Sequence, residues 1–222
     1  MNAFKRNTYS EQVVDYIKTR ILNGSLSPGE PVMEISIASE LSISRAPVRE
    51  AMQILLREGL IESHPQKVKH VTALTSKQIK DSYFTGGILE AAAVAKVLNR
   101  YTDKDIDKLE SILFQMKDIA DKGETLSKLA ELDNSFHNVL FSRIDNDLIK
   151  NLCRRSCQGI SKFLLYKHWL KLFPAMKVYQ RHKKIVDALK TRDAFIVEHV
   201  IREHYIESGE KMSAFGVDVN QE

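Results

Sequence analysis

An acidic residue and a histidine stand one helical turn apart in the stretch ELDNSFHNVLF. Asp133 and His137 are at positions i and i+4, so on a helix their side chains share one face, a usual spacing for two metal ligands. His182 and His204 each align with apolar residues at three- and four-residue spacing, which predicts that both point into a helical core. Three inward imidazoles and one carboxylate suit a divalent metal, zinc first, with nickel, manganese and iron as alternatives.

Two other interpretations of these residues stay open. Inward histidines are more often hydrogen-bonded than metal-bound, and a metal can also be purely structural. A metalloenzyme is a further alternative, because such a centre in a helical bundle could activate water or oxygen. Against catalysis, Glu198 and Glu203 lie directly before His199 and His204, so neither stands at the spacing of a known catalytic pair.

A second candidate site lies in EISIASELSISRAPVREAMQILLREGLIE. Two short helical patterns are joined by a tight connection, with Ser44 placed to cap the second helix and Pro47 in its first turn. Arg45, Arg49 and Gln53 recur at four-residue spacing on the side away from the apolar face. A helix-turn-helix presents such a strip to the major groove of DNA, where arginine forks onto guanine or clamps a phosphate. A solvated helix face is the alternative.

The elements that must position these residues divide the chain in two. Residues 1–74 predict three helices, then two strands over residues 60–63 and 69–72, which together outline a winged helix. Residues 79–222 have the 3.6-residue period of amphipathic helices, and we expect residues 75–78 to be a linker. The expected fold is therefore mainly α: an N-terminal winged helix-turn-helix with a small β-hairpin, followed by an all-α antiparallel helical bundle. Helix breaks are expected near Thr102, Gly123, Asn146, Pro174 and Thr191.

The composition is that of a globular chain, with 222 residues of which 43% are hydrophobic and 28% charged. No signal-like N-terminus and no apolar run near the roughly 20 residues that span a bilayer are visible, so we expect a cytoplasmic protein without membrane contact. The net charge of +4 suits nucleic acid without establishing it. Cys153 and Cys157 are expected to be small buried hydrophobes rather than a redox pair.

The stretch LSPGEPVMEISIASELSISRAPVREAMQILLREGLIE resembles the winged-helix domain of GntR-type bacterial transcription regulators. The matching features are the L-x-P-G opening, the acid at Glu34, the SRAPVREA run and the EGL exit. The resemblance implies that Ser44, Arg45, Pro47 and Arg49 lie at or near double-stranded operator DNA. It also implies that the hairpin is the wing.

Two positions depart from that family. Ser42 stands where the turn between the two helices usually has glycine, and Val68 stands where the wing tip usually has one. Without that wing-tip glycine, the wing would rely on Lys67, Lys69 and His70 instead. Residues 1–74 hold nine Lys and Arg against eight Asp and Glu, so a single DNA-binding domain is nearly neutral. We therefore expect a homodimer that reads two half-sites of a pseudo-palindrome.

The later motifs DNSFH, QRHKKIVDAL and IREH resemble the FCD ligand-sensing domain of the FadR branch. The resemblance implies that residues 79–222 form an effector-binding and dimerisation domain. It also implies that Asp133, His137, His182 and His204 hold a metal at the floor of an effector pocket.

The sequence departs from the FCD pattern where that domain commonly has an arginine that clamps a carboxylate. Gly86 stands there, followed by Gly87, which indicates either a late helix start or room made for something. Gly86, Ser156 and Tyr179 are assigned to the pocket walls. An organic acid as effector would then depend on the metal. The leading interpretation is a ligand-responsive transcription regulator, not an enzyme.

Overall fold

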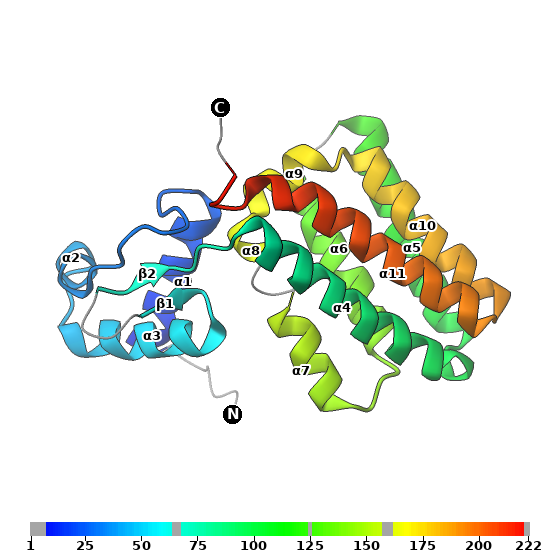
Figure 1. Cartoon of the computed structure of the whole chain (residues 1–222), viewed down its shortest axis with the longest axis horizontal. Helices are drawn as coiled ribbons and strands as arrows, with labels where there is room; N and C mark the ends of the chain where they lie inside the picture. The colour runs from blue at the N-terminus through cyan, green and yellow to red at the C-terminus, as the bar shows by residue number, and fades with distance from the viewer. Residues whose placement is uncertain (1–7, 64–67, 124–125, 157–161, 220–222) are drawn as a thin grey trace, which may run out of the picture. The chain divides into compact units, whose positions relative to one another are not determined.

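The computed structural model of the chain describes residues 8–63, 68–123, 126–156 and 162–219 (Figure 1). It divides into two compact units, residues 1–74 and 75–222. The described residues form helices and one two-stranded sheet, which confirms the mainly α fold class. No helix among them is long and apolar enough to cross a membrane.

Three helices and a hairpin make up the first unit. They are α1 (Tyr9–Leu22), α2 (Glu34–Glu40), α3 (Arg45–Glu58), β1 (Ile61–Glu62) and β2 (His70–Val71). Thr8 is the N-cap of α1 and forms a reciprocal capping box with Glu11. Its apolar face packs on α3. The side chains that the two helices bury are Val13, Val14, Ile17 and Ile21 on α1 and Val48, Ala51, Met52 and Leu55 on α3.

The expected hairpin is present, with strands of two residues each. Ile61 pairs with Val71 and Glu62 with His70, in antiparallel register. Pro31 forms an isolated bridge to His70 on the other side of β2. The loop before α2 therefore joins the hairpin, and the first unit closes around one core.

The second unit is a bundle of antiparallel helices. They are α4 (Ser76–Lys96), α5 (Asp103–Lys122), α6 (Leu126–Phe141), α7 (Asp147–Arg155), α8 (Lys162–Leu164), α9 (Tyr166–Leu172), α10 (Ala175–Thr191) and α11 (Ala194–Met212), with short 3-10 turns η1 (Leu98–Arg100) and η3 (Ser213–Phe215). α4 and α11 run antiparallel side by side (Figure 1).

Short polar residues and glycine set most helix boundaries of the bundle, where the sequence predicts them. Thr102, Asn146 and Asp193 are the N-caps of α5, α7 and α11, and Gly123 ends α5 with a φ of 67°. One boundary differs from expectation. α4 begins at Ser76, inside the stretch 75–78 expected as a linker, because Thr75 and Gln78 form a capping box that starts the helix.

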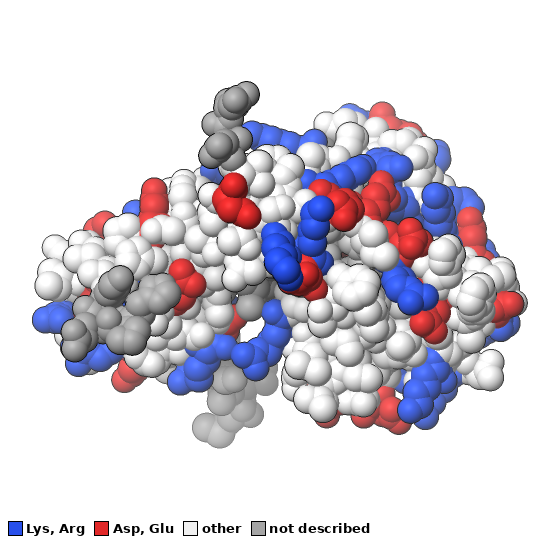
Figure 2. Space-filling view, viewed as in Figure 1, with Lys and Arg blue, Asp and Glu red and all other residues white. Residues whose placement is uncertain are grey.

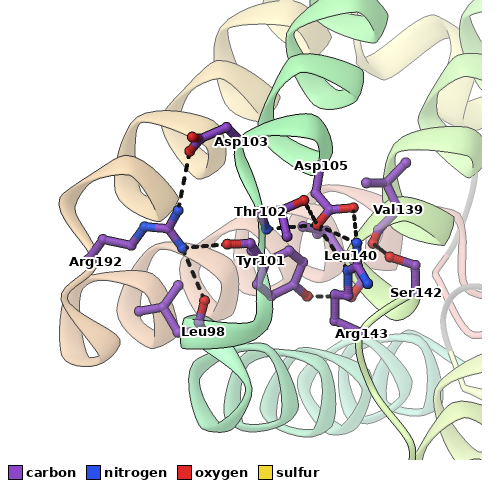
Figure 3. Close-up of polar contacts among 10 residues, drawn as sticks. All are labelled: Leu98, Tyr101, Thr102, Asp103, Asp105, Val139, Leu140, Ser142, Arg143 and Arg192. Carbon is purple, nitrogen blue, oxygen red and sulfur yellow. Dashed lines mark hydrogen bonds and ion pairs between the residues drawn. The ribbon is translucent and has the colours of Figure 1, made fainter.

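The buried carboxylate of Asp105 links neighbouring segments at one end of the bundle (Figure 3). Asp105 accepts two hydrogen bonds of 2.9 Å from the guanidinium of Arg143, and two of 2.8 Å from the backbone N–H and hydroxyl of Thr102. Arg192 donates to the backbone carbonyls of Leu98 and Tyr101 in the same view. Burial acts to raise the pKa of Asp105, but the hydrogen bonds from Thr102 and Arg143 outweigh it and lower the pKa.

Candidate metal site and DNA-contacting surface

Three histidines from three helices meet inside the bundle. His137 of α6, His182 of α10 and His204 of α11 place one ring nitrogen each within 4.8 Å of one another. The ring centroids of His182 and His204 are 4.9 Å apart, and that of His137 lies 5.7 and 5.6 Å from them. Because Zn–N bonds are about 2.0–2.1 Å long, small side-chain rotations would bring the three nitrogens onto one ion.

Two of the histidines are oriented by hydrogen bonds at their Nδ1 atoms. His137 Nδ1 lies 2.7 Å from Glu90 Oε1, and His182 Nδ1 lies 2.8 Å from the carbonyl oxygen of Val178. An Nδ1–H that donates to a carboxylate or a carbonyl leaves the lone pair on Nε2, which is the arrangement of metal-binding histidines.

Asp133 reaches this cluster through His182. Its Oδ1 lies 3.0 Å from His182 Nε2. The ligand atoms that all lie within 4.8 Å of one another belong to the three histidines. His182 Nε2 and His204 Nδ1 are buried, yet neither makes a hydrogen bond of good geometry. Buried nitrogens left in this way next to a carboxylate fit a divalent metal, because an ion would satisfy both kinds of ligand.

Two histidines of the cluster have lowered pKa values, which favours the neutral form that a metal requires. Burial lowers the pKa of His182, although the nearby carboxylate of Asp133 acts to raise it. Burial, followed by the positive charge of Arg181, lowers the pKa of His204 well below its ordinary value. A neutral imidazole offers a lone pair near neutral pH, so these two ligands need no proton loss before they bind an ion.

Glu90 and Tyr205 also belong to the site, although the spacing of residues in the sequence predicts no role for them. Glu90 is fully buried on α4 and accepts a hydrogen bond of 2.5 Å from the Tyr205 hydroxyl, while its other oxygen contacts His137. A signal was present in the sequence, because an acid within the apolar run ILEAAAVA needs a partner if it is buried.

Gly87 of α4 makes room for Tyr205. A Cβ at Gly87 would lie 2.7 Å from the Cβ of Tyr205, so only glycine allows this close approach of α4 and α11. α4 is helical from Ser76 through both glycines, which excludes the late helix start considered above. Gly86 is buried on the same helix.

The three residues assigned to the pocket walls lie on three helices: Gly86 on α4, Ser156 at the end of α7 and Tyr179 on α10. Ser156 donates to the carbonyl of Cys153, and Tyr179 lies near Lys117 of α5. A groove of 420 Å³ runs between α10 and α11, with Arg181 and His204 among its lining residues.

Cys153 is buried, and burial raises the pKa of its thiol to about 12. Cys157 lies outside the described residues.

On the first unit, the side chains expected at DNA lie along α3. Arg45, Arg49 and Gln53 are exposed. Ser44 is the N-cap residue, but its side chain makes no capping hydrogen bond, contrary to expectation. Pro47 explains this, because it occupies the third helical position, whose N–H a capping hydroxyl normally binds, and proline has none.

The wing is only partly described. Lys69 and His70 are half-buried at β2, and Val68 is exposed beside them. Lys67 lies outside the described residues. Ser42, the other departure from the family pattern, has a φ of 55°, which is the left-handed conformation that glycine favours.

Comparisons with known proteins match both units. The model of bacterial regulatory proteins of the gntR family matches residues 9–71, and the FCD domain matches residues 81–207. The HTH-type transcriptional repressor RspR of Escherichia coli is 27% identical over 207 residues, which cover 91% of this chain and 88% of that protein. The gluconate operon transcriptional repressor of Bacillus subtilis is 26% identical over 200 residues, covering 88% and 82%.

A solved structure of a GntR transcriptional regulator from Rhodococcus has the same fold. It superposes with a TM-score of 0.69 at 20% identity, over 93% of this chain and 98% of that one. The relatives named are transcription regulators and not enzymes. The chain therefore belongs to the gntR family of bacterial transcription regulators, in the FadR subfamily, with an N-terminal helix-turn-helix and a C-terminal FCD domain.

Proposed function

We propose that this regulator binds a pseudo-palindromic operator as a homodimer, and that a small molecule bound at a metal in the bundle changes its affinity for DNA. The observation that carries the proposal is the buried cluster of His137, His182 and His204, whose hydrogen bonds and pKa values favour metal binding. Bacterial operators lie in the cytoplasm, so the proposal places the protein there.

Four side chains would hold the metal: Asp133, His137, His182 and His204. Nitrogen and carboxylate ligands suit zinc, with nickel, manganese and iron as alternatives. A divalent ion with an open position accepts a carboxylate or hydroxyl oxygen from a small molecule. An organic acid is therefore the effector class to test first, and the relative named for the gluconate operon supports that choice.

The DNA contacts would come from the start of α3 and from the wing. Arg45 and Arg49 supply charge, and Ser44 leaves the first-turn N–H groups of α3 uncapped by its side chain, where a phosphate can bind. The other side chains proposed at DNA are Pro47, Gln53, Lys67, Lys69 and His70.

An apolar face on α4 and α7 is the proposed dimer surface. It consists of Phe84, Ile88, Leu148 and Leu152, all exposed and four residues apart on each helix. α4 and α7 contact each other, and the surface over α7 carries few charges (Figure 2). We propose that a second copy of the chain covers this face. A single, nearly neutral DNA-binding domain needs a linked partner to bind two half-sites.

The dimer surface is tested by charge. Leu148→Asp should convert the dimer to monomer in sedimentation experiments and weaken operator binding, because a carboxylate would be buried unpaired. Phe195→Asp is the matched control, since Phe195 is exposed at the start of α11, outside this face. A Leu148→Asp protein that still sediments as a dimer contradicts the proposed surface.

The sensor is tested by metal content and by DNA affinity together. Purified protein should hold about one divalent ion per chain by mass spectrometry, and His182→Ala should lose it. Gluconate and other small hydroxy acids should shift DNA affinity in the wild type and not in His182→Ala. If the wild type holds metal, and its removal unfolds the bundle while no acid alters DNA affinity, the metal is structural.

A further inference from the structure

Glu34 lies between the two arginines that we propose to contact DNA. Arg45 donates from Nε to Glu34 Oε1 at 2.7 Å. Arg49 donates from Nη2 to Oε1 at 3.1 Å and from Nε to Oε2 at 3.4 Å. The Glu34 side chain is 17% exposed, whereas those of Arg45 and Arg49 are 57% and 60% exposed. A partly buried acid in the first turn of α2 thus holds two exposed cations of α3.

The carboxylate of Glu34 stays charged in this arrangement. The hydrogen bond from Arg49 lowers its pKa, and the opposing effect of partial burial is smaller. One negative and two positive charges leave a balance of about +1 at the start of α3. Attraction to phosphate follows net positive charge, so Glu34 weakens the part of DNA binding that ignores sequence.

The hydrogen bonds leave the two arginines with different free ends. Arg45 donates to Glu34 from Nε, so its two Nη nitrogens are not needed for that contact and can fork onto O6 and N7 of a guanine. Arg49 donates to Glu34 from Nε and Nη2, which leaves Nη1 outside that contact and suits a single phosphate contact.

We infer that Glu34 is a positioning residue for sequence recognition: it orients Arg45 to read a guanine and Arg49 to hold a phosphate. The inference rests on the proposed operator binding. A guanidinium that is already held loses less freedom when it meets its base, whereas a free one binds phosphates of any sequence. Glu34 therefore sets the ratio of operator affinity to random-DNA affinity.

The test separates the effect of the Glu34 charge from the effect of its side-chain length. The wild-type full chain selects a duplex from a random-sequence library, and each variant is then titrated with that duplex and with an unrelated duplex over a range of salt. Glu34→Gln removes the charge, and Glu34→Asp keeps the charge but is too short to hold both arginines. Glu58→Gln is the matched control, because Glu58 pairs with Lys18 at the other end of α3.

We expect Glu34→Gln to lower the ratio of selected to unrelated affinity by about tenfold. Its binding to unrelated DNA should also become steeper in log salt by about one unit. Glu34→Asp should lower the ratio with an unchanged salt slope, and Glu58→Gln should keep the wild-type ratio. Equal thermal midpoints for all variants would exclude unfolding as the cause.

Three results would overturn the inference. Suppose that the wild type selects a duplex, and that Glu34→Gln and Glu34→Asp both keep its ratio of selected to unrelated affinity within twofold. Glu34 is then only a contact between helices. Placing 7-deazaguanine in the half-site should weaken the wild type by about tenfold and leave Arg45→Ala unaffected; an equal loss in both removes the guanine role from Arg45. If the wild type selects nothing, the proposed operator binding itself fails, and this inference fails with it.

Discussion

In each unit one carboxylate holds two partners, and the two carboxylates differ in burial: Glu34 is partly buried with exposed partners, whereas Glu90 is fully buried. In the first unit Glu34 holds two exposed arginines. In the bundle Glu90 is fully buried and holds His137 and the Tyr205 hydroxyl. Both carboxylates fix the orientation of groups that we propose to bind something else, DNA in one unit and metal in the other.

Burial decides what each carboxylate contributes. Exposed ion pairs contribute about 0–1 kcal/mol, because water solvates the charges when the pair breaks. A buried polar group that loses its partner costs about 1–3 kcal/mol, because no water replaces it. Glu34 should therefore matter for recognition and little for stability, whereas Glu90 should matter for both metal binding and stability.

Loss of the Glu90 carboxylate should have a greater effect than loss of the Glu34 or Asp105 carboxylate. Glu90→Leu leaves His137 Nδ1 and the Tyr205 hydroxyl without their acceptor, so the free energy of unfolding should fall by about 3 kcal/mol. Metal affinity should fall by about 10–100-fold, the usual effect of removing a group that orients a ligand. Urea unfolding and metal titration measure the two quantities.

Two matched variants sharpen the result. Tyr205→Phe removes only one hydrogen bond of Glu90 and should cost about 1 kcal/mol. Glu34→Gln should change the unfolding free energy by less than about 1 kcal/mol. Equal losses in Glu90→Leu and Glu34→Gln would mean that burial does not distinguish the two carboxylates.

Asp105 is an intermediate case, a buried carboxylate whose partner Arg143 is 39% exposed. Arg143→Met should cost about 2 kcal/mol at neutral pH, less than the loss of a fully buried pair. The folded-state pKa of Asp105 is lowered, so its stabilising effect is present above the ordinary carboxyl pKa and is lost as pH falls through the lowered value. The difference between wild type and Arg143→Met in urea unfolding should shrink over that acidic range. A pH-independent difference would show that packing, not charge, carries the contact.

Local signals predicted the helices and the inward histidines. Thr102, Asn146 and Asp193 cap helices through neighbouring backbone groups, so a few residues of sequence suffice to place them. The histidines follow from the 3.6-residue period of their own helices, which predicts that they face inward and does not identify their partners.

The parts of the site that sequence reasoning missed depend on contacts between distant residues. Glu90 meets a histidine 47 positions away and a tyrosine 115 positions away, and periodicity within one helix says nothing about such pairs. Glu34 stood out as part of a family motif, but its bridge to Arg45 and Arg49 depends on how α2 and α3 pack. The Ser44 cap failed for a local reason, the missing N–H of Pro47, which the sequence already contained.

The weakest effect is expected at two strained backbone positions, one in each unit. Ser42 in the first unit and Arg192 in the bundle have φ of 55° and 58°, which is unfavourable for residues with a Cβ. Ser42→Gly should raise the thermal midpoint, by the equivalent of about 0.5–1 kcal/mol, because glycine adopts this conformation without strain. Arg192→Gly should gain nothing or lose stability, because it also removes hydrogen bonds to the carbonyls of Leu98 and Tyr101. If both variants gain equally, the Arg192 contacts contribute nothing; if Ser42→Gly loses stability, the Ser42 side chain makes a contact that offsets its strain.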